Sequence, residues 1–326
     1  MFRTMLIIIF SLPFTQACLA EAQETLSLSL QDAKRIALEN NRDIQIERKT
    51  LEISLGDINT QKGIFDPVLN LSSYYRDAKT PTASTFIQSG AINEEEFNAE
   101  SGVTGNLPTG TFYNLFNFSL TRTTTDSPVE TLSPNWFTNL SFSVGQELLR
   151  NFGLDVNLAP ITVAKRFSEI SSKQLETTIS DILLNVETNY WLVVAARQDL
   201  ENQTTALELA KDLQRRNEIQ VEVGVLAPVT VTQAKSEVAA RQVDVIRAEN
   251  NLKASEDNLK NILALPLAQP IFATDEPITV LKKFDENKVL EEALEERPEV
   301  AQAKLDIENK ETQKKFFSNQ RLPRLA

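Results

Sequence analysis

Residues 229–264 read VTVTQAKSEVAARQVDVIRAENNLKASEDNLKNILA. One set of side chains in this stretch recurs in steps that alternate between three and four residues, and all of them except Arg241 are apolar or small. They are Val231, Ala234, Val238, Arg241, Val245, Ala248, Leu252, Ser255, Leu259 and Ile262. Such steps average about 3.5 residues, the repeat of helices in a coiled coil. The stretch therefore predicts a long helix packed lengthwise against another.

The partner helix is predicted immediately before it. No Gly or Pro lies between Pro160 and Gly224, and apolar residues again follow steps of three and four: Ile179, Ile182, Val186, Tyr190, Val193, Ala196 and Leu200. Gly224 and Pro228 separate the two arms, because glycine permits a reversal of the chain and proline suits the first turn of a helix. We predict a helical hairpin over 157–264, with arms at 160–217 and 229–264. Helical spacing also marks residues 28–66, with a break at Asn40–Asn41.

Residues 67–148 follow a different period, because apolar side chains alternate with polar ones. In WFTNLSFSVG, residues 136–145, one face carries Trp136, Leu140, Phe142 and Val144, and the other carries Asn, Ser and Gly. Residues 112–120 alternate similarly, and Leu69, Leu71 and Tyr75 indicate a third strand. We expect the polar segments 79–96 and 121–135 to be surface loops. These strands form either a soluble sheet with one wet face or a transmembrane sheet, and Trp136, as a membrane-interface residue, favours the second.

The N-terminus has the pattern of an export signal. Arg3 precedes an apolar run over residues 5–14, and Ala20-Glu21-Ala22 fits a cleavage site, so we predict a signal peptide at 1–22. Cys18 as a lipidated first residue is the second interpretation, because the residues before it fit a lipidation signal poorly. In either case we expect the mature chain to be exported.

The composition excludes several classes of protein. The 326 residues include 45 acidic and 33 basic side chains, which gives a net charge of −12, with one Cys and no His. A His-based triad, a His-ligated metal and a CxxC motif are therefore impossible, and the negative charge argues against nucleic-acid binding. We expect no enzyme activity, no catalytic residue, no cofactor and no metal site. The acidic runs Glu94–Glu96, Glu291–Glu292 and Glu295–Glu296 are interpreted as solvated surfaces.

A repeat links the two ends of the sequence. Residues 37–44, ALENNRDI, resemble residues 293–300, ALEERPEV, at an offset of 256. The same offset carries Pro67 onto Pro323 and Leu69 onto Leu325. We therefore predict an equatorial connecting segment at 265–297 and the start of a second repeat at 298–326, cut short where its strands would begin.

Four motifs in order resemble those of the outer-membrane efflux proteins, the TolC-like outer-membrane factors of Gram-negative bacteria. They are Leu30-x-x-Ala33-x-x-x-Ala37-Leu38-x-x-Asn41, residues 142–153 (FSVGQELLRNFG), residues 224–234 (GVLAPVTVTQA) and the repeated Ala293-Leu294. The resemblance implies a mainly α fold with a membrane β segment: long antiparallel coiled-coil hairpins form a periplasmic α-barrel, and amphipathic strands form a shared transmembrane β-barrel. For a full-length member it implies a homotrimer in the outer-membrane lipid, with its helices in the periplasm.

The same resemblance implies a function and a partner site. The function is that of a passive exit duct in a tripartite efflux or type I secretion system, docked on a periplasmic adaptor and an inner-membrane pump. The hairpin tip would contact the adaptor through Val223, Gly224, Val225 and Pro228, with Arg216 nearby. A structural interpretation of Gly224 and Pro228, as the residues that allow the helix reversal, stands beside it.

Two alternatives and one departure accompany this prediction. A periplasmic adaptor also has an export signal and a coiled-coil hairpin, but aromatic alternating strands before the hairpin favour the duct. Family members continue through a second strand pair and a second hairpin, so the second alternative is a truncated, nonfunctional member. We expect this chain to make no stable channel alone unless extra subunits compensate. Residues 97–123 resemble an additional hairpin beside the expected strands.

Overall fold

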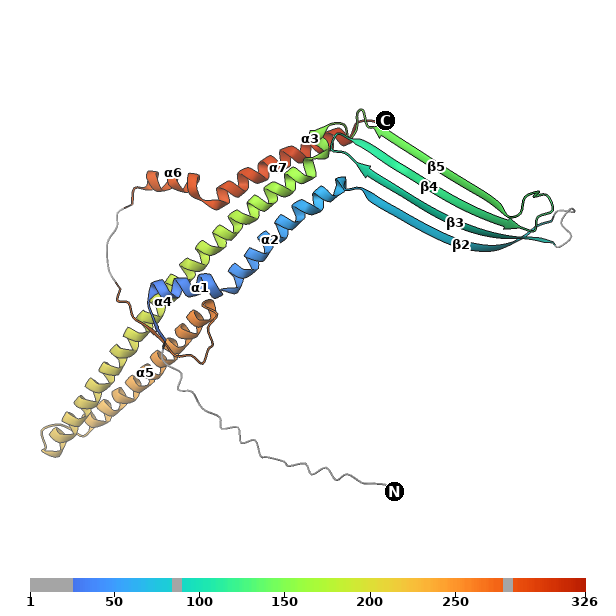
Figure 1. Ribbon diagram of the computed structural model, residues 1–326. Coiled ribbons are helices and arrows are strands. Elements are labelled where there is room, and N and C mark those ends of the chain that lie inside the picture. Colours follow the sequence, from blue (N-terminus) through green and yellow to red (C-terminus); the bar gives the residue numbers. More distant parts are fainter. Residues whose placement is uncertain (1–25, 84–89, 278–283) are drawn as a thin grey trace, which may run out of the picture. The chain divides into compact units, whose positions relative to one another are not determined.

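The computed structural model describes residues 26–83, 90–277 and 284–326 (Figure 1). The predicted signal peptide and Cys18 lie outside the described residues. The chain divides into two compact units, Met1–Asn41 with Ile182–Val280 and Arg42–Asp181 with Leu281–Ala326. As predicted, the described residues are mainly helical, with one large antiparallel sheet.

Each unit combines helices with strands. The first holds β1 (Leu26–Leu28), α1 (Leu30–Asn40), α5 (Val229–Ile262) and β6 (Ile271–Ala273). The second holds α2 (Arg42–Lys62), the 3-10 helix η1 (Gly63–Phe65), β2 (Val68–Pro81), β3 (Ala91–Asn106), β4 (Thr111–Thr125), β5 (Asn135–Gln146), α3 (Leu154–Asn157), α6 (Glu286–Glu296) and α7 (Pro298–Gln320). Helix α4 (Ala159–Glu222) contributes to both.

The coiled-coil hairpin of the first unit is confirmed. Every residue of the predicted α5 seam, from Val231 to Ile262, is buried or half-buried, as are the predicted apolar positions of α4. The Lys235 ammonium lies 3.9 Å from the Glu218 carboxylate and links the two arms. The first arm ends at Glu222, five residues later than predicted, because Gln220 and Val221 still supply carbonyl acceptors for the turn that follows.

A compact core closes this unit at the base of the hairpin. Strands β1 and β6 pair in parallel, with Leu28 opposite Ala273. The core cluster joins five elements and consists of Leu28, Ala33, Ala37, Val186, Tyr190, Val193, Leu259, Leu263, Ile271 and Ala273. The prediction that helix begins at residue 28 is wrong by two residues: Leu28 lies in β1, and Ser29 caps α1. The strand depends on a partner more than 240 residues away, so local periodicity could not indicate it.

The break between α1 and α2 also has a structural partner. Asn41 is 5% exposed, and its side-chain amide donates to the carbonyl of Ile262 at 2.9 Å. That carbonyl belongs to the last turn of α5, where the helix itself has no backbone N–H that can donate to it. The Asn40–Asn41 pair thus ends one helix and completes another.

Strands β2 to β5 form a four-stranded antiparallel meander in chain order (Figure 1). The additional hairpin suspected at 97–123 is real, and both of its strands, β3 and β4, belong to the same sheet. The expectation of loops at 79–96 and 121–135 is wrong in part, because residues 79–81, 91–96, 121–125 and 135 are strand. Ladder hydrogen bonds join backbone groups, so a polar segment can pair as well as an apolar one.

The second unit repeats the start of the chain. Helices α1 and α6 each have 11 residues and begin 256 residues apart, at Leu30 and Glu286. Their N-caps, Ser29 and Asp285, each accept a hydrogen bond from a backbone N–H of the first turn. The next helices begin at Arg42 and Pro298, again 256 residues apart. The element bounds thus follow the offset predicted from the sequence.

Candidate functional site

The sheet of the second unit has two faces of opposite chemistry. Cross-strand pairing places one set of large side chains together, and we name it the apolar face: Leu69, Leu71, Tyr75, Phe97, Val103, Phe116, Phe118, Leu120, Trp136, Leu140, Phe142 and Val144. The opposite side, the polar face, carries residues such as Asn70, Ser72, Asn98, Glu100, Asn117, Ser119, Thr121, Asn139, Ser141 and Ser143. Because side chains alternate along each strand, this separation runs across all four strands.

The apolar face is exposed, and on strands β2 and β5 most of the polar face is exposed as well. Leu71, Phe142 and Val144 have exposed fractions of 71%, 69% and 75%. A water-soluble sheet would cover such an apolar face with a second layer. A contiguous apolar surface of this extent requires an apolar environment.

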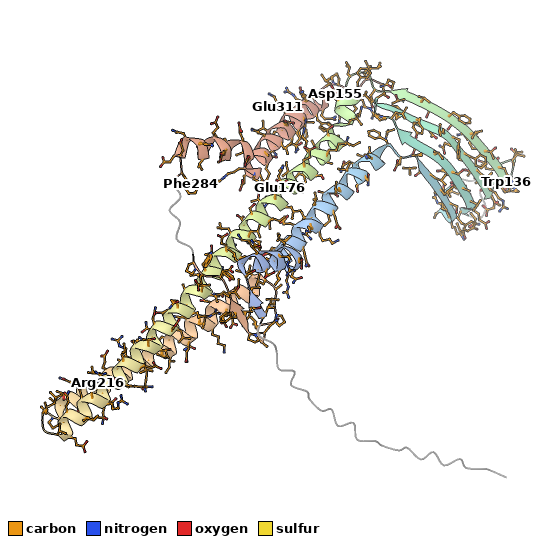
Figure 2. The ribbon with its side chains drawn as sticks, turned by 60° about the vertical axis from the view of Figure 1, so that its left-hand side comes forward. Trp136, Asp155, Glu176, Arg216, Phe284 and Glu311 are labelled. Carbon is orange, nitrogen blue, oxygen red and sulfur yellow. The ribbon has the colours of Figure 1, made fainter. Side chains whose placement is uncertain are left out.

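The apolar face has the height of a membrane core and aromatic residues at its margin. From Trp136 to Val144, β5 makes eight steps of about 3.4 Å, or about 27 Å, close to the apolar band of about 25 Å in membrane sheets. Trp136 lies at the end of the sheet farthest from α7 (Figure 2), and the Arg122 guanidinium lies 5.7 Å from the centre of its ring. Trp136 therefore has the position and the polar neighbour expected of an interface residue.

None of the helices in the described parts of the chain combines the length and the hydropathy needed to cross a membrane.

Four of the five predicted partner residues lie at the hairpin tip. Gly224 has a φ of +79°, which permits the reversal, and the N–H groups of Val225 and Leu226 donate to the Gln220 carbonyl at 2.8 and 3.2 Å. Pro228 precedes the first residue of α5. Val223 and Val225 project into solvent, with exposed fractions of 68% and 71%.

The fifth predicted residue, Arg216, lies earlier on α4. Its guanidinium forms an ion pair with Asp212 at 2.7 Å, one helical turn away, so it is fixed along the helix surface (Figure 2). Two further apolar residues, Ile219 and Val229, are exposed at the tip and were missed. Their position next to the predicted turn, outside the coiled-coil seam, was the signal that could have found them.

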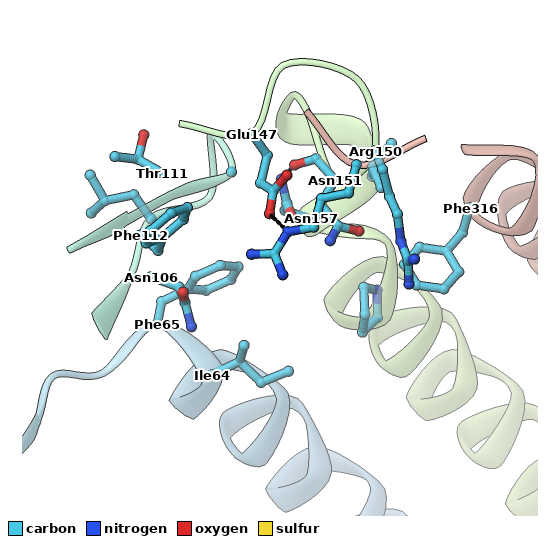
Figure 3. Close-up of a pocket in the computed structure, with 15 residues that line it drawn as sticks. Ile64, Phe65, Asn106, Thr111, Phe112, Glu147, Arg150, Asn151, Asn157 and Phe316 are labelled. Carbon is cyan, nitrogen blue, oxygen red and sulfur yellow. Dashed lines mark hydrogen bonds and ion pairs between the residues drawn. The ribbon is translucent and has the colours of Figure 1, made fainter. Parts of the chain in front are cut away.

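A cavity of about 480 Å³ lies where the sheet meets the helices of the second unit (Figure 3). Glu147 is 6% exposed, and its Oε1 accepts a hydrogen bond from Arg324 Nε at 2.8 Å. The β3–β4 turn is held here, because the Glu147 N–H donates to the Gly110 carbonyl and the Gly153 N–H to that of Thr109. At Gly110, a Cβ would collide with the Asn151 carbonyl. These hydrogen bonds therefore hold the β3–β4 turn in place beside the cavity.

The described residues contain no cluster of His, Cys, Asp and Glu that could hold a metal ion. The groups around the junction cavity are an ion pair, amides and apolar side chains, with no activated nucleophile among those that line it. The candidate functional sites are therefore two exposed apolar surfaces, the apolar face of the sheet and the hairpin tip.

The family model for outer membrane efflux proteins matches residues 34–265, from α1 to the end of the hairpin. This chain belongs to the outer membrane efflux protein family. The family assignment made from the sequence motifs is confirmed. A comparison with curated proteins finds no match.

Solved structures of this family share the fold. The CmeC outer membrane channel of Campylobacter jejuni is 15% identical, with a TM-score of 0.61 over 87% of this chain and 52% of that one. The outer-membrane channel OprN is 14% identical, with a TM-score of 0.62 over 90% and 56%. The outer membrane protein VceC of Vibrio cholerae is 13% identical, with a TM-score of 0.57 over 90% and 60%. The efflux protein chain described here thus spans a little over half the length of these channels.

Proposed function

We propose that this outer membrane efflux protein is a channel subunit of a tripartite efflux or type I secretion system. It would contribute to a passive exit duct in the outer membrane of a Gram-negative bacterium, with its helices in the periplasm, in the homotrimer expected of a full-length member. The observation that carries the proposal is the four-stranded sheet, with an exposed apolar face about 27 Å high and a polar opposite face. Family membership supports the same function.

The two faces of the sheet would have different surroundings in a duct. Lipid acyl chains cover the apolar face, and water and solute pass along the polar face, where Ser, Thr and Asn supply hydrogen-bonding groups. A passive duct needs no catalytic group, in keeping with the family and the solved structures, which are channels rather than enzymes. The pump would supply the energy for export, and this chain would form part of the path that the solute follows.

The hairpin tip is proposed as the adaptor site. Val223 and Val225 expose apolar side chains at a tight reversal that Gly224 permits, which suits insertion into a partner's helical groove. Arg216 adds a charge beside it, already oriented by Asp212. A periplasmic adaptor, the second function considered from the sequence, is disfavoured because a soluble scaffold has no use for the exposed apolar sheet face.

Outer-membrane fractionation with a matched pair of substitutions tests the proposed function. Leu140 lies on the apolar face near the middle of β5, and Asn139 lies next to it on the polar face; both are exposed. Leu140→Arg places a charge in lipid at a cost of about 2–4 kcal/mol, whereas Asn139→Arg places it in water. We expect Leu140→Arg to remove the protein from the outer membrane, and Asn139→Arg to leave it there as a heat-sensitive oligomer on unheated gels.

Equal behaviour of the two variants would refute the membrane orientation. The adaptor site has its own test, because Val225→Cys should cross-link to an adaptor hairpin in intact cells. Val243→Cys, on the exposed side of α5 and away from the tip, is its control. Cross-links at Val243 but not at Val225 would place the partner elsewhere.

A further inference from the structure

Helices α2 and α7 occupy equivalent places in the repeat and lie on either side of α4 (Figure 1, Figure 2). The side of α7 that faces α4 carries Gln302, whose amide donates to the Thr177 hydroxyl at 3.5 Å, and Asn309, which is 3% exposed. The offset of 256 carries these two α7 residues onto Ile46 and Ile53 of α2. The side of α2 that matches the α4-facing side of α7 is thereby identified.

On α2 this matching side is exposed. Ile46 and Ile53, two helical turns apart, are 59% and 66% exposed, whereas Ile44 and Ser54 on another side of α2 are buried. Apolar residues spaced in this way form the seam of a coiled coil when a partner helix covers them. We name the side with Ile46 and Ile53 the outer stripe; it has the spacing of a seam and is uncovered in the described part of the chain.

An ion pair between α7 and α4 has a counterpart on α2 as well. The Arg166 guanidinium of α4 lies 3.1 Å from the Glu308 carboxylate of α7. The offset carries Glu308 onto Glu52, whose side chain is 62% exposed and pairs with Lys49 on the same helix. If α2 lay where α7 lies, it would therefore offer Arg166 a carboxylate at the same level.

The residues after α7 show how a strand of this kind pairs with β5. The Leu148 N–H, just past β5, donates to the Leu325 carbonyl at 2.8 Å. The offset carries Leu325 onto Leu69 of β2, and β2 and β5 are the two edge strands of the four-stranded sheet. Because β5 runs toward the helices and β2 away from them, β2 of a second copy would lie antiparallel to β5, with Leu69 opposite Leu148.

The backbone directions at both edges agree with this register. The Thr82 N–H donates to the Gly90 carbonyl, so even-numbered residues of β2 bond toward β3, and odd-numbered ones, such as Leu69, direct their backbone groups outward. The Glu147 N–H donates toward the β3–β4 turn, so even-numbered residues at the other edge, such as Leu148, direct theirs outward. The register thus pairs outward groups with outward groups.

The register also joins like faces and gives a reasonable strand tilt. It sets Tyr75 opposite Phe142, both on the apolar face. Within one chain the ladders place Tyr75 level with Trp136, whereas the register sets Trp136 opposite Pro81 of the second copy, six residues further along β2. Six residues are about 20 Å along the strands, and four strands are about 19 Å across. The resulting tilt of about 45° lies in the range of membrane sheets.

We propose that the outer stripe of α2 and the outer edge of β2 form one surface that binds a second copy of this chain. The second copy offers the α4 and β5 surface that its own α7 and residues 321–326 cover. The inference rests on the proposed function, because it describes how channel subunits join. Helix α7 and the neighbour's α2 compete for one place, so assembly exchanges one for the other.

A disulfide between copies tests the strand register. Tyr74 would lie opposite Ser143 in a pair without mutual hydrogen bonds, where Cα atoms are about 4.5 Å apart, a distance that a disulfide spans. Within one chain the two residues lie on opposite edge strands, about 14 Å apart. We expect the full chain with Tyr74→Cys and Ser143→Cys to form disulfide-linked oligomers in outer-membrane fractions. Tyr74→Cys with Asn139→Cys, four residues out of register, is the matched control and should cross-link about tenfold less.

Two charge reversals in the double-cysteine background test the exchange of helices. Glu52→Lys should lower the yield of cross-linked oligomer about threefold, because α2 would then repel Arg166 of the second copy. Glu308→Lys should raise the yield by a similar factor, because it weakens the hold of the competing α7 on α4. Damage to the fold alone would lower the yield in both variants.

The outcomes separate this inference from the proposed function. A heat-sensitive oligomer in the outer membrane without the disulfide between positions 74 and 143 would overturn the docking surface and leave the duct standing. Equal cross-linking of the control pair, or effects of the same sign from the two charge reversals, would also overturn it. Absence of the wild-type chain from the outer membrane would overturn both. If the first cysteine pair fails to insert, Arg76→Cys with Ser141→Cys, the next such pair in the same register, decides the matter.

Discussion

Tyr190 offers the sharpest test of how the first unit is held together. Its side chain is fully buried, and its hydroxyl donates to the Leu28 carbonyl and accepts from the Asp275 N–H, both at 3.0 Å. One hydroxyl thus joins α4 to β1 and to Asp275, two residues after the end of β6. Tyr190→Phe removes this hydroxyl and leaves the ring in place.

The expected cost follows from what each partner loses. The Leu28 carbonyl retains the Thr274 N–H at 3.0 Å, so it stays hydrogen-bonded. The Asp275 N–H is left without the hydroxyl, and an unsatisfied, partly buried donor costs about 1–3 kcal/mol. We therefore expect the free energy of unfolding of the first unit to fall by about 2 kcal/mol rather than by twice that amount.

Urea unfolding followed by tryptophan fluorescence measures this change. Trp191 lies 5.4 Å from the Tyr190 ring, edge to face, and reports on the same core; a Trp136→Phe background removes the only other tryptophan. The control is Tyr75→Phe, at a hydroxyl on a 62% exposed ring, with an expected change within about 0.5 kcal/mol. Equal stability of the Tyr190→Phe and Tyr75→Phe proteins would refute the argument that the buried hydroxyl joins the three elements.

Three further predictions concern other single contacts. Asn41→Ala should destabilise the first unit by about 1 kcal/mol in the same urea assay, because the Ile262 carbonyl loses its side-chain donor; an unchanged midpoint would contradict this. Gly110→Ala should lower the temperature at which the heat-sensitive oligomer dissociates, because a φ of +91° strains any residue with a Cβ, at a cost of about 1 kcal/mol or more. The pKa of Asp32 lies below its ordinary 3.8, chiefly because its carboxylate accepts a hydrogen bond from the Ser29 hydroxyl. The stabilisation is complete above that value and is lost as the pH falls through the lowered pKa, so Ser29→Ala should flatten the acid end of a stability profile, and an unaltered profile would count against it.

The helical part of the fold was predictable because its signal is local. A seam that repeats about every 3.5 residues specifies which side chains face the partner helix, and the burial of Ala234, Val238 and Leu259 follows from it directly. The helix reversal was predictable for the same reason, since Gly224 supplies a conformation that few other residues adopt. The family assignment used the turn motif at residues 224–234 among others, and that motif lies within the part of the chain that the family model matches.

Strand β1 and the hold of Asn41 on α5 could not be predicted from local pattern. Leu26–Leu28 is too short to show a period, and its partner β6 lies far along the sequence. The Asn41 side chain contributes to the end of a helix that stops at Ile262, a contact visible only once the chain is folded. Single hydrogen bonds between distant segments leave no trace in the hydropathy of either segment.

The polar half of the sheet was missed for a different reason, and that reason bears on function. Residues 91–96 and 121–125 lack the apolar alternation that indicates a strand, so they resembled loops. In the structure they continue β3 and β4 past the aromatic margin, where the sheet has no apolar face and alternation is not required. Alternation therefore marks the stretch of each strand that contributes to the apolar face rather than the strand itself. Glu94 and Glu96 were interpreted as a solvated surface because no apolar residues surround them in the sequence, and pairing with β2 and β4 places both on the side of the sheet opposite the apolar face.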